Sequence, residues 1–312
     1  MARKKRGKPI HGWLNIDKDY EMGSTNVVGA VRRIMDAQKV GHAGTLDPMA
    51  TGILPIALGE ATKTVAYMQD ADKDYSFTLK WGEATNTDDA EGEVIETSDV
   101  RPSLEDVEAV LSEFTGVIKQ VPPQFSAIKV KGQRAYDIAR RGDAAEIPAR
   151  DVHVIKLDCV SCDGQSASFD VTCGKGTYIR SLARDIAKRL GSCAYVTVLR
   201  RTRVGYFSEK NAISLAELEK MVHNKPPEEL VMPVTTALDD IPALLLTAEE
   251  ATKLSHGQVI RFLSLQDCNR LKAIGVELGD YKGHILAVTK DKPLAITQLD
   301  GVILKSVRVL NL

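Results

Sequence analysis

Residues 152–191, VHVIKLDCVSCDGQSASFDVTCGKGTYIRSLARDIAKRLG, contain the pattern that decides the fold class. Apolar and polar side chains alternate over 152–160 and over 167–173, as they do in half-buried strands, and Asp163-Gly164 between them favours a tight turn. Apolar residues then recur at helical spacing over 179–190. Consecutive strands joined by a short turn pair antiparallel, so this stretch predicts a hairpin followed by a helix.

The rest of the first 240 residues mixes strands and helices without a regular alternation. Helix starts are expected at Ser24 or Thr25, at Ser103 and at Ser214, whose hydroxyl groups can cap a helix. Further strands are expected over 12–18, 53–58, 75–81, 195–199 and 204–207. We therefore predict an α+β fold with a mixed, largely antiparallel sheet, and not a Rossmann fold.

The chain length of 312 residues suggests about two domains. Prolines at 226, 227 and 233 interrupt the pattern, and a new unit begins near residue 241. It starts with a short helix capped by Thr247 and continues with apolar clusters separated by glycine-containing turns. We expect a basic flexible tail over 1–11, a large domain over 12–240 and a small β-rich domain over 241–312.

Charge is unevenly distributed along the chain, although 41 basic and 42 acidic residues nearly cancel. Residues 83–113 carry eleven acids and one base, whereas 119–141 carry six bases and one acid, and 172–205 carry eight bases and one acid. The tail also has five bases within residues 1–8. We expect the two basic stretches to form one electropositive surface and the acidic stretch to face elsewhere, an arrangement that favours a polyanionic partner.

Five cysteines and the absence of a secretory signal argue against a disulfide framework. Cys159 and Cys162 have C-x-x-C spacing, which leaves open a zinc site or two buried thiols in a strand. The spacing to Cys173 and Cys193 does not repeat the first pair, so we expect no metal site. No apolar run approaches the ~18 residues that a membrane span requires, so we expect a cytoplasmic protein without membrane partners.

Two glycine-rich loops carry the candidate chemistry. In the first, residues 41–52, Asp47 precedes Pro48, which favours an extended conformation and a carboxylate held by a stiff loop. A plain turn aspartate is the alternative. In the second loop, residues 174–180, the P-loop spacing is absent, and Arg180 falls in the first turn of a helix, where the helix dipole disfavours a cation. A carboxylate partner would offset this cost, and Asp47 is the candidate; a solvated arginine is the alternative.

Seven segments in this order resemble the bacterial TruB family of tRNA pseudouridine synthases. They are Gly12–Lys18, Gly41–Gly52, Gly59–Lys63, Lys73–Tyr75, Pro122–Ala127 with Lys129, Gly174–Arg180 and Leu199–Arg201. The resemblance covers residues 12–220, and it implies the pseudouridine synthase type of catalytic domain. Residues 241–312 resemble, more weakly, the PUA-like RNA-binding domain that such enzymes carry.

The resemblance also implies roles for individual side chains. Asp47 would be the catalytic nucleophile, paired with Arg180 and supported by Lys18. His42 would lie on the loop that is inserted into the RNA. Three further side chains would contact the target uracil, with the first of them stacking on the base: Tyr75, Tyr178 and Leu199.

The implied reaction is the isomerisation of uridine 55 in the T-loop of tRNA to pseudouridine, after the base is flipped out of the RNA. It requires no metal and no organic cofactor, and the implied partner is the T-arm of tRNA without a guide RNA. We expect a monomer. Asp19 stands where the family usually has proline, which affects the expected conformation next to Lys18. The alternatives are an RNA-binding protein without catalysis and a hydrolase that uses Asp47 and His42.

Overall fold

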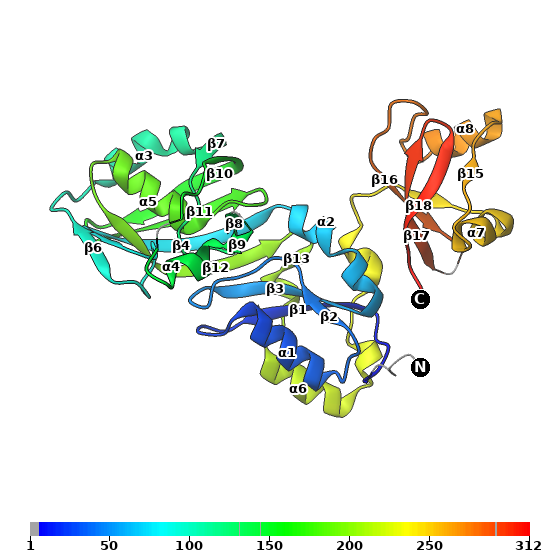
Figure 1. The fold of residues 1–312 in the computed structure, drawn as a ribbon, viewed down its shortest axis with the longest axis horizontal. Helices are drawn as coiled ribbons and strands as arrows, with labels where there is room; N and C mark the ends of the chain where they lie inside the picture. Colours follow the sequence, from blue (N-terminus) through cyan, green and yellow to red (C-terminus); the bar gives the residue numbers. More distant parts are fainter. Residues whose placement is uncertain (1–5, 131, 144, 291) are drawn as a thin grey trace.

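Two large β-sheets with helices packed on them form the framework of the protein (Figure 1). The computed structural model describes residues 6–130, 132–143, 145–290 and 292–312. The central path of the larger sheet is, in spatial order, β1 (Gly12–Lys18), β3 (Thr51–Leu58), β12 (Ala194–Val204), β4 (Lys73–Trp81), β11 (Ser166–Cys173), β10 (Arg150–Cys162) and β7 (Gly116–Gln120). Two short strands extend it, since β2 (Val40–His42) pairs with β3, and β13 (Phe207–Ser208) pairs with β12.

The larger sheet confirms the predicted fold class. Its neighbouring strands run antiparallel except for β3 and β12, which are parallel. The hairpin predicted around Asp163-Gly164 is formed by β10 and β11. The predicted break between 199 and 204 is wrong, because β12 continues through this polar stretch. Arg201 can stay within the sheet, although it is 1% exposed, because its guanidinium group binds backbone carbonyl oxygens.

Helices and short strands complete the larger unit. The helices are α1 (Ser24–Ile34), α2 (Val65–Asp70), α3 (Leu104–Val110), α4 (Ala135–Ala139), α5 (Ile179–Arg189) and α6 (Leu215–Asn224), with single turns at η1 (Gly59–Lys63), η2 (Leu111–Phe114), η3 (Glu209–Asn211), η4 (Pro227–Glu229) and η5 (Val234–Ala237). Two small hairpins are β5 (Glu83–Thr85) with β6 (Val94–Thr97), and β8 (Lys129–Val130) with β9 (Gln133–Arg134). The predicted caps at Ser103 and Ser214 are confirmed. The predicted cap at Ser24 or Thr25 is wrong, since Gly23 occupies the cap position of α1.

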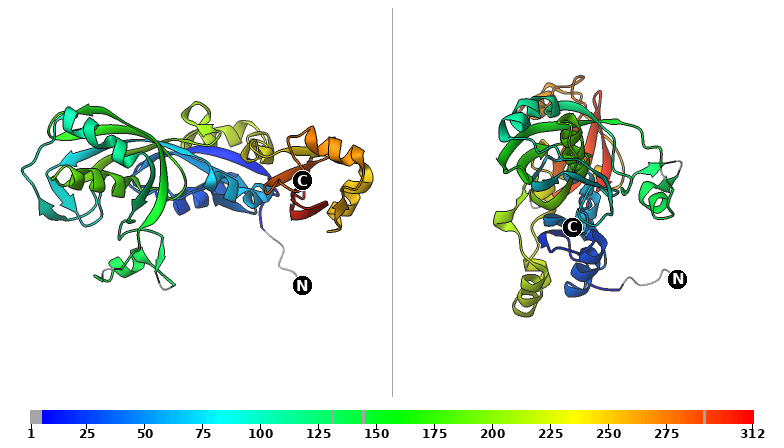
Figure 2. Two further views of the ribbon diagram at one scale, coloured as in Figure 1. Left: turned by 90° about the horizontal axis from the view of Figure 1, so that it is seen from above. Right: turned by 90° about the vertical axis from the view of Figure 1, so that its left-hand side faces the viewer.

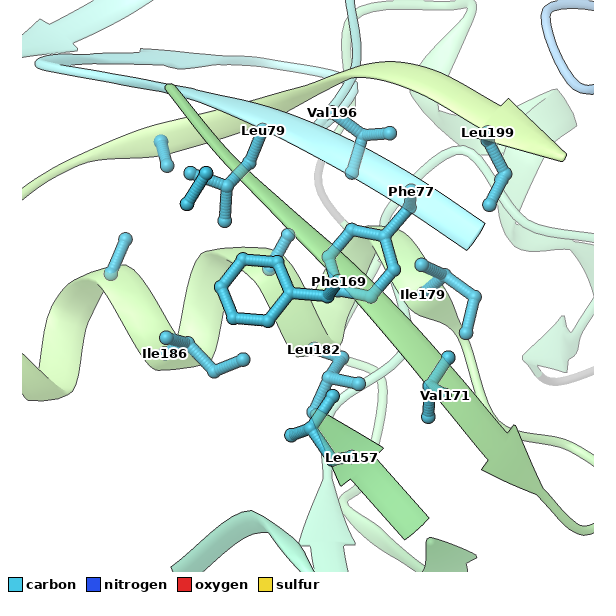
Figure 3. Packing of buried hydrophobic residues seen from close by; sticks show 14 of the residues in the cluster. Phe77, Leu79, Leu157, Phe169, Val171, Ile179, Leu182, Ile186, Val196 and Leu199 are labelled. Atoms are coloured by element: carbon cyan, nitrogen blue, oxygen red, sulfur yellow. The ribbon is translucent and has the colours of Figure 1, made fainter. Parts of the chain in front are cut away.

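The main hydrophobic core lies where α5 covers β4, β11 and β12 (Figure 3). Phe77 of β4 and Phe169 of β11 stack with their ring centroids 5.0 Å apart. Leu182 and Ile186 of α5 pack against the same cluster and are fully buried. This packing fixes the start of α5, and therefore Arg180, relative to the sheet.

The C-terminal unit is a separate five-stranded sheet with two helices, drawn in orange and red in Figure 1. Its strand order is β14 (Ala243–Leu245), β16 (His284–Val288), β17 (Pro293–Asp300), β18 (Ile303–Val309) and β15 (Ile260–Arg261), with α7 (Ala248–Ser255) and α8 (Leu265–Lys272). The predicted β-rich character and the cap at Thr247 are confirmed. The sequence interpretation missed α8, although Ser264 and Asp267 form a capping box at its start.

The two units share one hydrophobic cluster. Leu286 and Leu310 of the C-terminal unit are buried together with Trp13 and Ala61 of the larger unit. Polar contacts follow the same seam, since the Lys63 ammonium group donates to the carbonyl of Val309 at 2.8 Å. The C-terminal unit is therefore packed onto the end of the larger sheet.

The segment 124–147 projects from the body of the larger unit (Figure 2). It contains β8, β9 and α4, and a small apolar cluster around Ala135 and Ile147 holds it together. Gln124 closes its base, because the side-chain amide donates to the carbonyl of Ala145 and accepts from the backbone N–H of the same residue, both at 2.9 Å. The projection places part of the basic stretch 119–141 away from the sheet.

The predicted separation of acidic and basic stretches is wrong in part. Three arginines of α5 pair with acids of the stretch 83–113: Arg180 with Asp89, Arg184 with Asp88, and Arg189 with Glu113. Opposite charges that are far apart in the sequence meet because the acidic stretch packs beside α5. The acidic stretch therefore compensates part of the basic surface instead of facing elsewhere.

None of the described helices combines the length and the apolar character that a membrane crossing requires. The five cysteines are free thiols. Burial raises the pKa of Cys159 to about 11, which suits a thiol that packs as an apolar side chain. Across the described ranges, no group of three His, Cys, Asp or Glu side chains has the arrangement of a metal site.

Candidate active site

A cavity of about 800 Å³ opens between the loop 44–50, the strand β4 and the start of α5. Five of the seven predicted site residues line it: Asp47, Tyr75, Tyr178, Arg180 and Leu199. These side chains come from four separate segments of the sequence, and the sheet brings them together. A cavity of this size is typical of a small-molecule or nucleotide site.

The predicted pair of Asp47 and Arg180 is present. Nη2 of Arg180 lies 2.8 Å from Oδ2 of Asp47. The side chain of Arg180 is only 5% exposed, whereas that of Asp47 is 32% exposed. The arginine is therefore part of the wall, and the carboxylate faces the open cavity. This geometry leaves one face of the carboxylate free for a reacting group.

A second carboxylate binds the same arginine. Nη1 of Arg180 lies 3.1 Å from Oδ2 of Asp89, a side chain that is 3% exposed. The guanidinium group also donates to the carbonyl oxygens of Thr87 at 2.9 Å and Phe125 at 3.1 Å. These contacts compensate a cation that is buried in the first turn of α5, where the helix dipole disfavours it.

Sequence reasoning missed Asp89. It lies in an acidic stretch, and nothing in its spacing distinguishes it from the other ten acids there. Asp88, its neighbour, has a positive φ of 61°. A non-glycine residue with this conformation marks a special turn, but the sequence does not reveal it.

Ser24 and Lys18 hold the loop on either side of Asp47. The Ser24 hydroxyl accepts from the N–H of Leu46 at 2.8 Å and donates to the carbonyl of the same residue at 2.9 Å. The Lys18 ammonium group donates to the carbonyl of Pro48 at 3.1 Å. Ser24 therefore does not cap α1, because its hydroxyl is used by the loop.

Lys18 contacts the backbone next to Asp47 and does not line the cavity. Burial lowers the pKa of Lys18 to about 8, while the charge of Asp47 opposes this shift. Its ammonium group also donates to the backbone carbonyl of Asp19 at 2.9 Å. Every residue type has a backbone carbonyl, so Lys18 can make this contact with Asp19 as well as with the proline that the family usually has at position 19.

Tyr75 and Leu199 reach the cavity from neighbouring strands. Tyr75 pairs with Arg201 in the register of β4 and β12, and Leu199 pairs with Phe77. Burial raises the pKa of the Tyr75 hydroxyl above its ordinary value, while the nearby Arg201 acts in the opposite direction. Tyr75 therefore presents a neutral, half-buried aromatic ring to the cavity that Asp47 also lines.

Tyr178 is fixed at its backbone. Its N–H donates to the Gln120 side chain at 2.8 Å, and the same amide donates to the carbonyl of Tyr178 at 3.1 Å. The guanidinium group of Arg150 lies over the tyrosine ring, 5.1 Å from its centroid. These contacts hold the aromatic ring at the edge of the cavity.

His42 does not line the cavity. It lies on β2, opposite Ile56 of β3, and its side chain is half-buried. Burial lowers the pKa of His42, and the charge of Arg201 adds to this effect. Its Nδ1 is buried and has no hydrogen-bond partner among the described residues. The insertion of His42 into RNA stays a prediction. Because Asp47 lines the cavity and His42 does not, the structure weighs against a hydrolase that uses both side chains.

The arrangement suits a reaction on an aromatic base. A partly open carboxylate shares the cavity with aromatic side chains, among them Tyr75 and Tyr178, with aliphatic side chains and with two buried arginines, Arg180 and Arg201. Such a site can stack a flat ring and place a nucleophile or base beside it. Arg201 was part of a resembling segment, but the sequence interpretation gave it no role.

Two family models match adjacent parts of the chain. The model described as TruB family pseudouridylate synthase (N terminal domain) matches residues 32–179, and the model described as tRNA pseudouridylate synthase B C-terminal domain matches residues 180–239. The second match includes Arg180 and Leu199, so the two models together contain all five predicted side chains that line the cavity.

Curated relatives match all or most of the chain. The protein named tRNA pseudouridine synthase B of Caulobacter vibrioides (strain ATCC 19089 / CIP 103742 / CB 15) is 50% identical over 313 residues and covers 100% of both chains. The protein of the same name from Gluconacetobacter diazotrophicus (strain ATCC 49037 / DSM 5601 / CCUG 37298 / CIP 103539 / LMG 7603 / PAl5) is 56% identical over 265 residues, which is 84% of this chain and 87% of the relative.

Solved structures share the fold across nearly the full length. The matching chain in a crystal structure of a Cbf5–Nop10–Gar1 complex has a TM-score of 0.73 and 23% identity, and the match covers 99% of this chain and 91% of that chain. A chain in an archaeal box H/ACA Nop10–Cbf5 complex has a TM-score of 0.71 and 24% identity, with coverage of 99% and 92%. The family matches and the full-length relatives show that this chain belongs to the TruB family of pseudouridylate synthases.

Proposed function

We propose that this chain converts uridine 55 in the T-loop of tRNA to pseudouridine, with Asp47 as the catalytic carboxylate. The observation that carries the proposal is the pair of Asp47 and Arg180 at the wall of a cavity that also presents Tyr75. The name of these relatives, tRNA pseudouridine synthase B, supports tRNA as the substrate.

The reaction detaches uracil from the ribose at N1 and rejoins it at C5. A carboxylate beside the sugar can act on the sugar or the base, and the cavity retains the uracil between the two steps. Tyr178 and Leu199 line the same cavity as Asp47, so they can hold the free uracil there. Atoms and electrons balance within the nucleotide, so the reaction uses no external group donor.

The target base is stacked in free tRNA and has to be flipped out, which costs a few kcal/mol. Stacking of the base on an aromatic side chain returns ~1–3 kcal/mol. Tyr75 is the candidate, since it lines the cavity beside Asp47. His42, which is half-buried on β2, would enter the RNA in the space that the flipped base leaves.

Basic side chains at the cavity mouth would bind the phosphate groups of the T-arm. Arg134, Arg150 and Lys175 line the opening, and Arg140 and Arg141 extend this set along the projecting segment 124–147. Phosphate contacts position the RNA and supply affinity, whereas the cavity selects the base.

The C-terminal unit, residues 241–312, would act as a PUA-like RNA-binding domain beside a catalytic domain of residues 12–240. Its packing against Trp13 and Ala61 would hold it at a set distance from Asp47. We propose that the protein works as a monomer in the cytoplasm, without guide RNA, metal or organic cofactor.

The test is incubation of the purified chain with an unmodified tRNA transcript in EDTA, followed by mapping of pseudouridine. The proposal predicts one modified position, 55, in the absence of any added RNA or protein. A matched transcript with cytidine at position 55 should remain unmodified. No pseudouridine in the first transcript, or modification that requires an added RNA or metal, would contradict the proposal.

A further inference from the structure

Arg201 binds the backbone at both ends of the loop that carries Asp47. Its Nε donates to the carbonyl of Ile53 at 2.7 Å, and its Nη2 donates to the carbonyl of Gly44 at 3.2 Å. Residues 44 and 53 lie on opposite sides of Asp47 in the sequence, so one planar guanidinium group connects the entry and the exit of the loop.

The deep burial of Arg201 indicates that its contacts with the loop contribute to the site. The side chain is 1% exposed, whereas its neighbours Arg200 and Arg203 are partly exposed and pair with carboxylates. A buried cation that relies on neutral carbonyl oxygens is expensive compared with a solvated one. Such a group is expected where its position serves the site.

The shape of β12 places Arg201 toward the loop. Between Arg201 and Arg203 the register with β4 slips by one residue, so that Arg201 pairs with Tyr75 and Arg203 with Asp74. In a regular strand, two residues at this spacing would face the same side of the sheet. Arg201 lies on the same face of β12 as the buried Leu199, two residues earlier, whereas the bulge turns Arg203 to the opposite face, where it pairs with Asp74.

Two glycines with positive φ flank the part of the loop that carries Asp47. Gly44 has a φ of +99° and Gly52 a φ of +101°, both in the region that favours glycine. A Cβ atom on Gly52 would clash with the backbone carbonyl of Arg201, so β12 and the loop end lie in close contact. Glycine permits this conformation but does not enforce it, and the guanidinium contacts of Arg201 constrain both ends of the loop in addition to the contacts of Ser24 and Lys18 next to Asp47.

We infer that Arg201 is a positioning residue, which fixes the loop so that the Asp47 carboxylate meets Arg180 and the substrate in the reactive geometry. The inference rests on the proposed function. The roles of the two arginines differ, because Arg201 binds the backbone of the loop whereas Arg180 contacts the carboxylate of Asp47. A misplacement of about 1 Å at a reacting group can cost roughly 10²-fold in rate.

The test uses the full chain with Arg201→Lys, which keeps the charge but cannot reach both carbonyls with one planar group. We expect a folded protein that binds tRNA within threefold of the wild type and forms pseudouridine about 10²-fold more slowly in single turnover. Arg101→Lys is the control, because Arg101 also donates to backbone carbonyls, those of Ser98 and Val100, but on an exposed loop. It should keep the wild-type rate.

A second readout separates positioning from folding. In Arg201→Ala, free guanidinium ion should restore part of the rate, while an equal concentration of ammonium ion should not. A wild-type rate in Arg201→Lys, or a loss that lies entirely in tRNA affinity, would overturn the inference, and so would failure of both variants to fold. The wild-type reaction is measured first, so its absence would count against the proposed function instead.

Discussion

Asp89 accepts a hydrogen bond at 3.1 Å from Nη1 of Arg180, the terminal nitrogen that does not contact Asp47. Asp89 is buried, and Asp47 is partly exposed. One carboxylate therefore anchors the arginine, and the arginine holds the other carboxylate at the cavity. The three side chains come from three separate segments, so the relationship exists only in the folded chain.

Asp89→Asn should reduce the rate and leave tRNA binding intact. The amide keeps the size of the side chain but removes the charge that balances Arg180, so the arginine is free to turn toward Asp47 and away from its present geometry. We expect a loss of about 10²-fold in single-turnover pseudouridine formation. Glu113→Gln is the control, because it breaks a solvent-screened pair with Arg189, which lies on the same helix as Arg180. Equal rates in wild type and Asp89→Asn would contradict this account of Arg180.

Tyr75→Phe should be tolerated better than Tyr75→Leu. Phenylalanine keeps the aromatic face that can stack on the flipped base, whereas leucine keeps only bulk. The measurement is the single-turnover rate of both variants at saturating tRNA, with Tyr206→Leu as a control at an exposed tyrosine outside the cavity. Equal losses for phenylalanine and leucine would show that stacking is not the contribution of this ring.

Lys18 should make the stability of the protein depend on pH. Its pKa is lowered to about 8 by burial, below the ordinary value of 10.5. Between these two values the unfolded chain binds the proton more than the folded chain does, so the free energy of unfolding rises with pH there. Below pH 8 Lys18 is ionised in both the folded and the unfolded chain, and the cost of burying its charge lowers the free energy of unfolding.

The measurement compares urea unfolding of wild type and Lys18→Met at pH 7 and pH 9.5. The difference in unfolding free energy should move in favour of the wild type as the pH rises, because methionine does not titrate. Lys73, whose pKa is also about 8, is present in both proteins and cancels. A difference that does not change with pH would contradict the shifted pKa of Lys18.

Local patterns in the sequence were sufficient for most of the fold. Alternation predicted the hairpin of β10 and β11, and capping pairs at Ser103 and Ser214 predicted helix starts. The exceptions have tertiary causes. Serine is a common helix cap, but the hydroxyl of Ser24 binds Leu46 in the loop. Strand β12 continues through its arginines because backbone carbonyl oxygens and carboxylates bind their guanidinium groups.

A site residue could be predicted when the family resemblance assigned it a role and the fold places it at the cavity. Asp47, Arg180 and Tyr75 meet both conditions. Asp89 and Arg201 could not be found, since their roles depend on side-chain contacts between segments that lie far apart in the sequence. His42 resembles a family residue, but the structure places it outside the cavity.

Affinity for tRNA should fall steeply with salt, because basic side chains at the cavity and on the segment 124–147 would contact phosphates. Each phosphate contact contributes roughly 0.7–0.9 to the slope of log affinity against log salt. Arg140→Ser and Arg141→Ser should each reduce the slope by about that amount, whereas Lys220→Ser, on α6 and away from the segment, should not. A slope that does not change in any variant would remove the proposed RNA-binding face.

The proposed function depends most on Asp47 being the catalytic group. In Asp47→Asn, the amide keeps the size and much of the hydrogen bonding of the carboxylate but removes its charge and its nucleophilicity. A catalytic Asp47 predicts a loss of at least about four orders of magnitude in rate, equal to ~5.4 kcal/mol of barrier. An aspartate that only stabilised the loop would cost about 1 kcal/mol of stability and leave most of the activity.

The most direct measurement is single-turnover pseudouridine formation at position 55 by Asp47→Asn, on a preparation whose thermal unfolding and tRNA affinity are measured in parallel. The account predicts a folded variant that binds tRNA like the wild type and forms no pseudouridine on the time scale of the wild-type reaction. A folded, tRNA-binding variant that works within tenfold of the wild-type rate would contradict the assignment of Asp47 as the catalytic carboxylate.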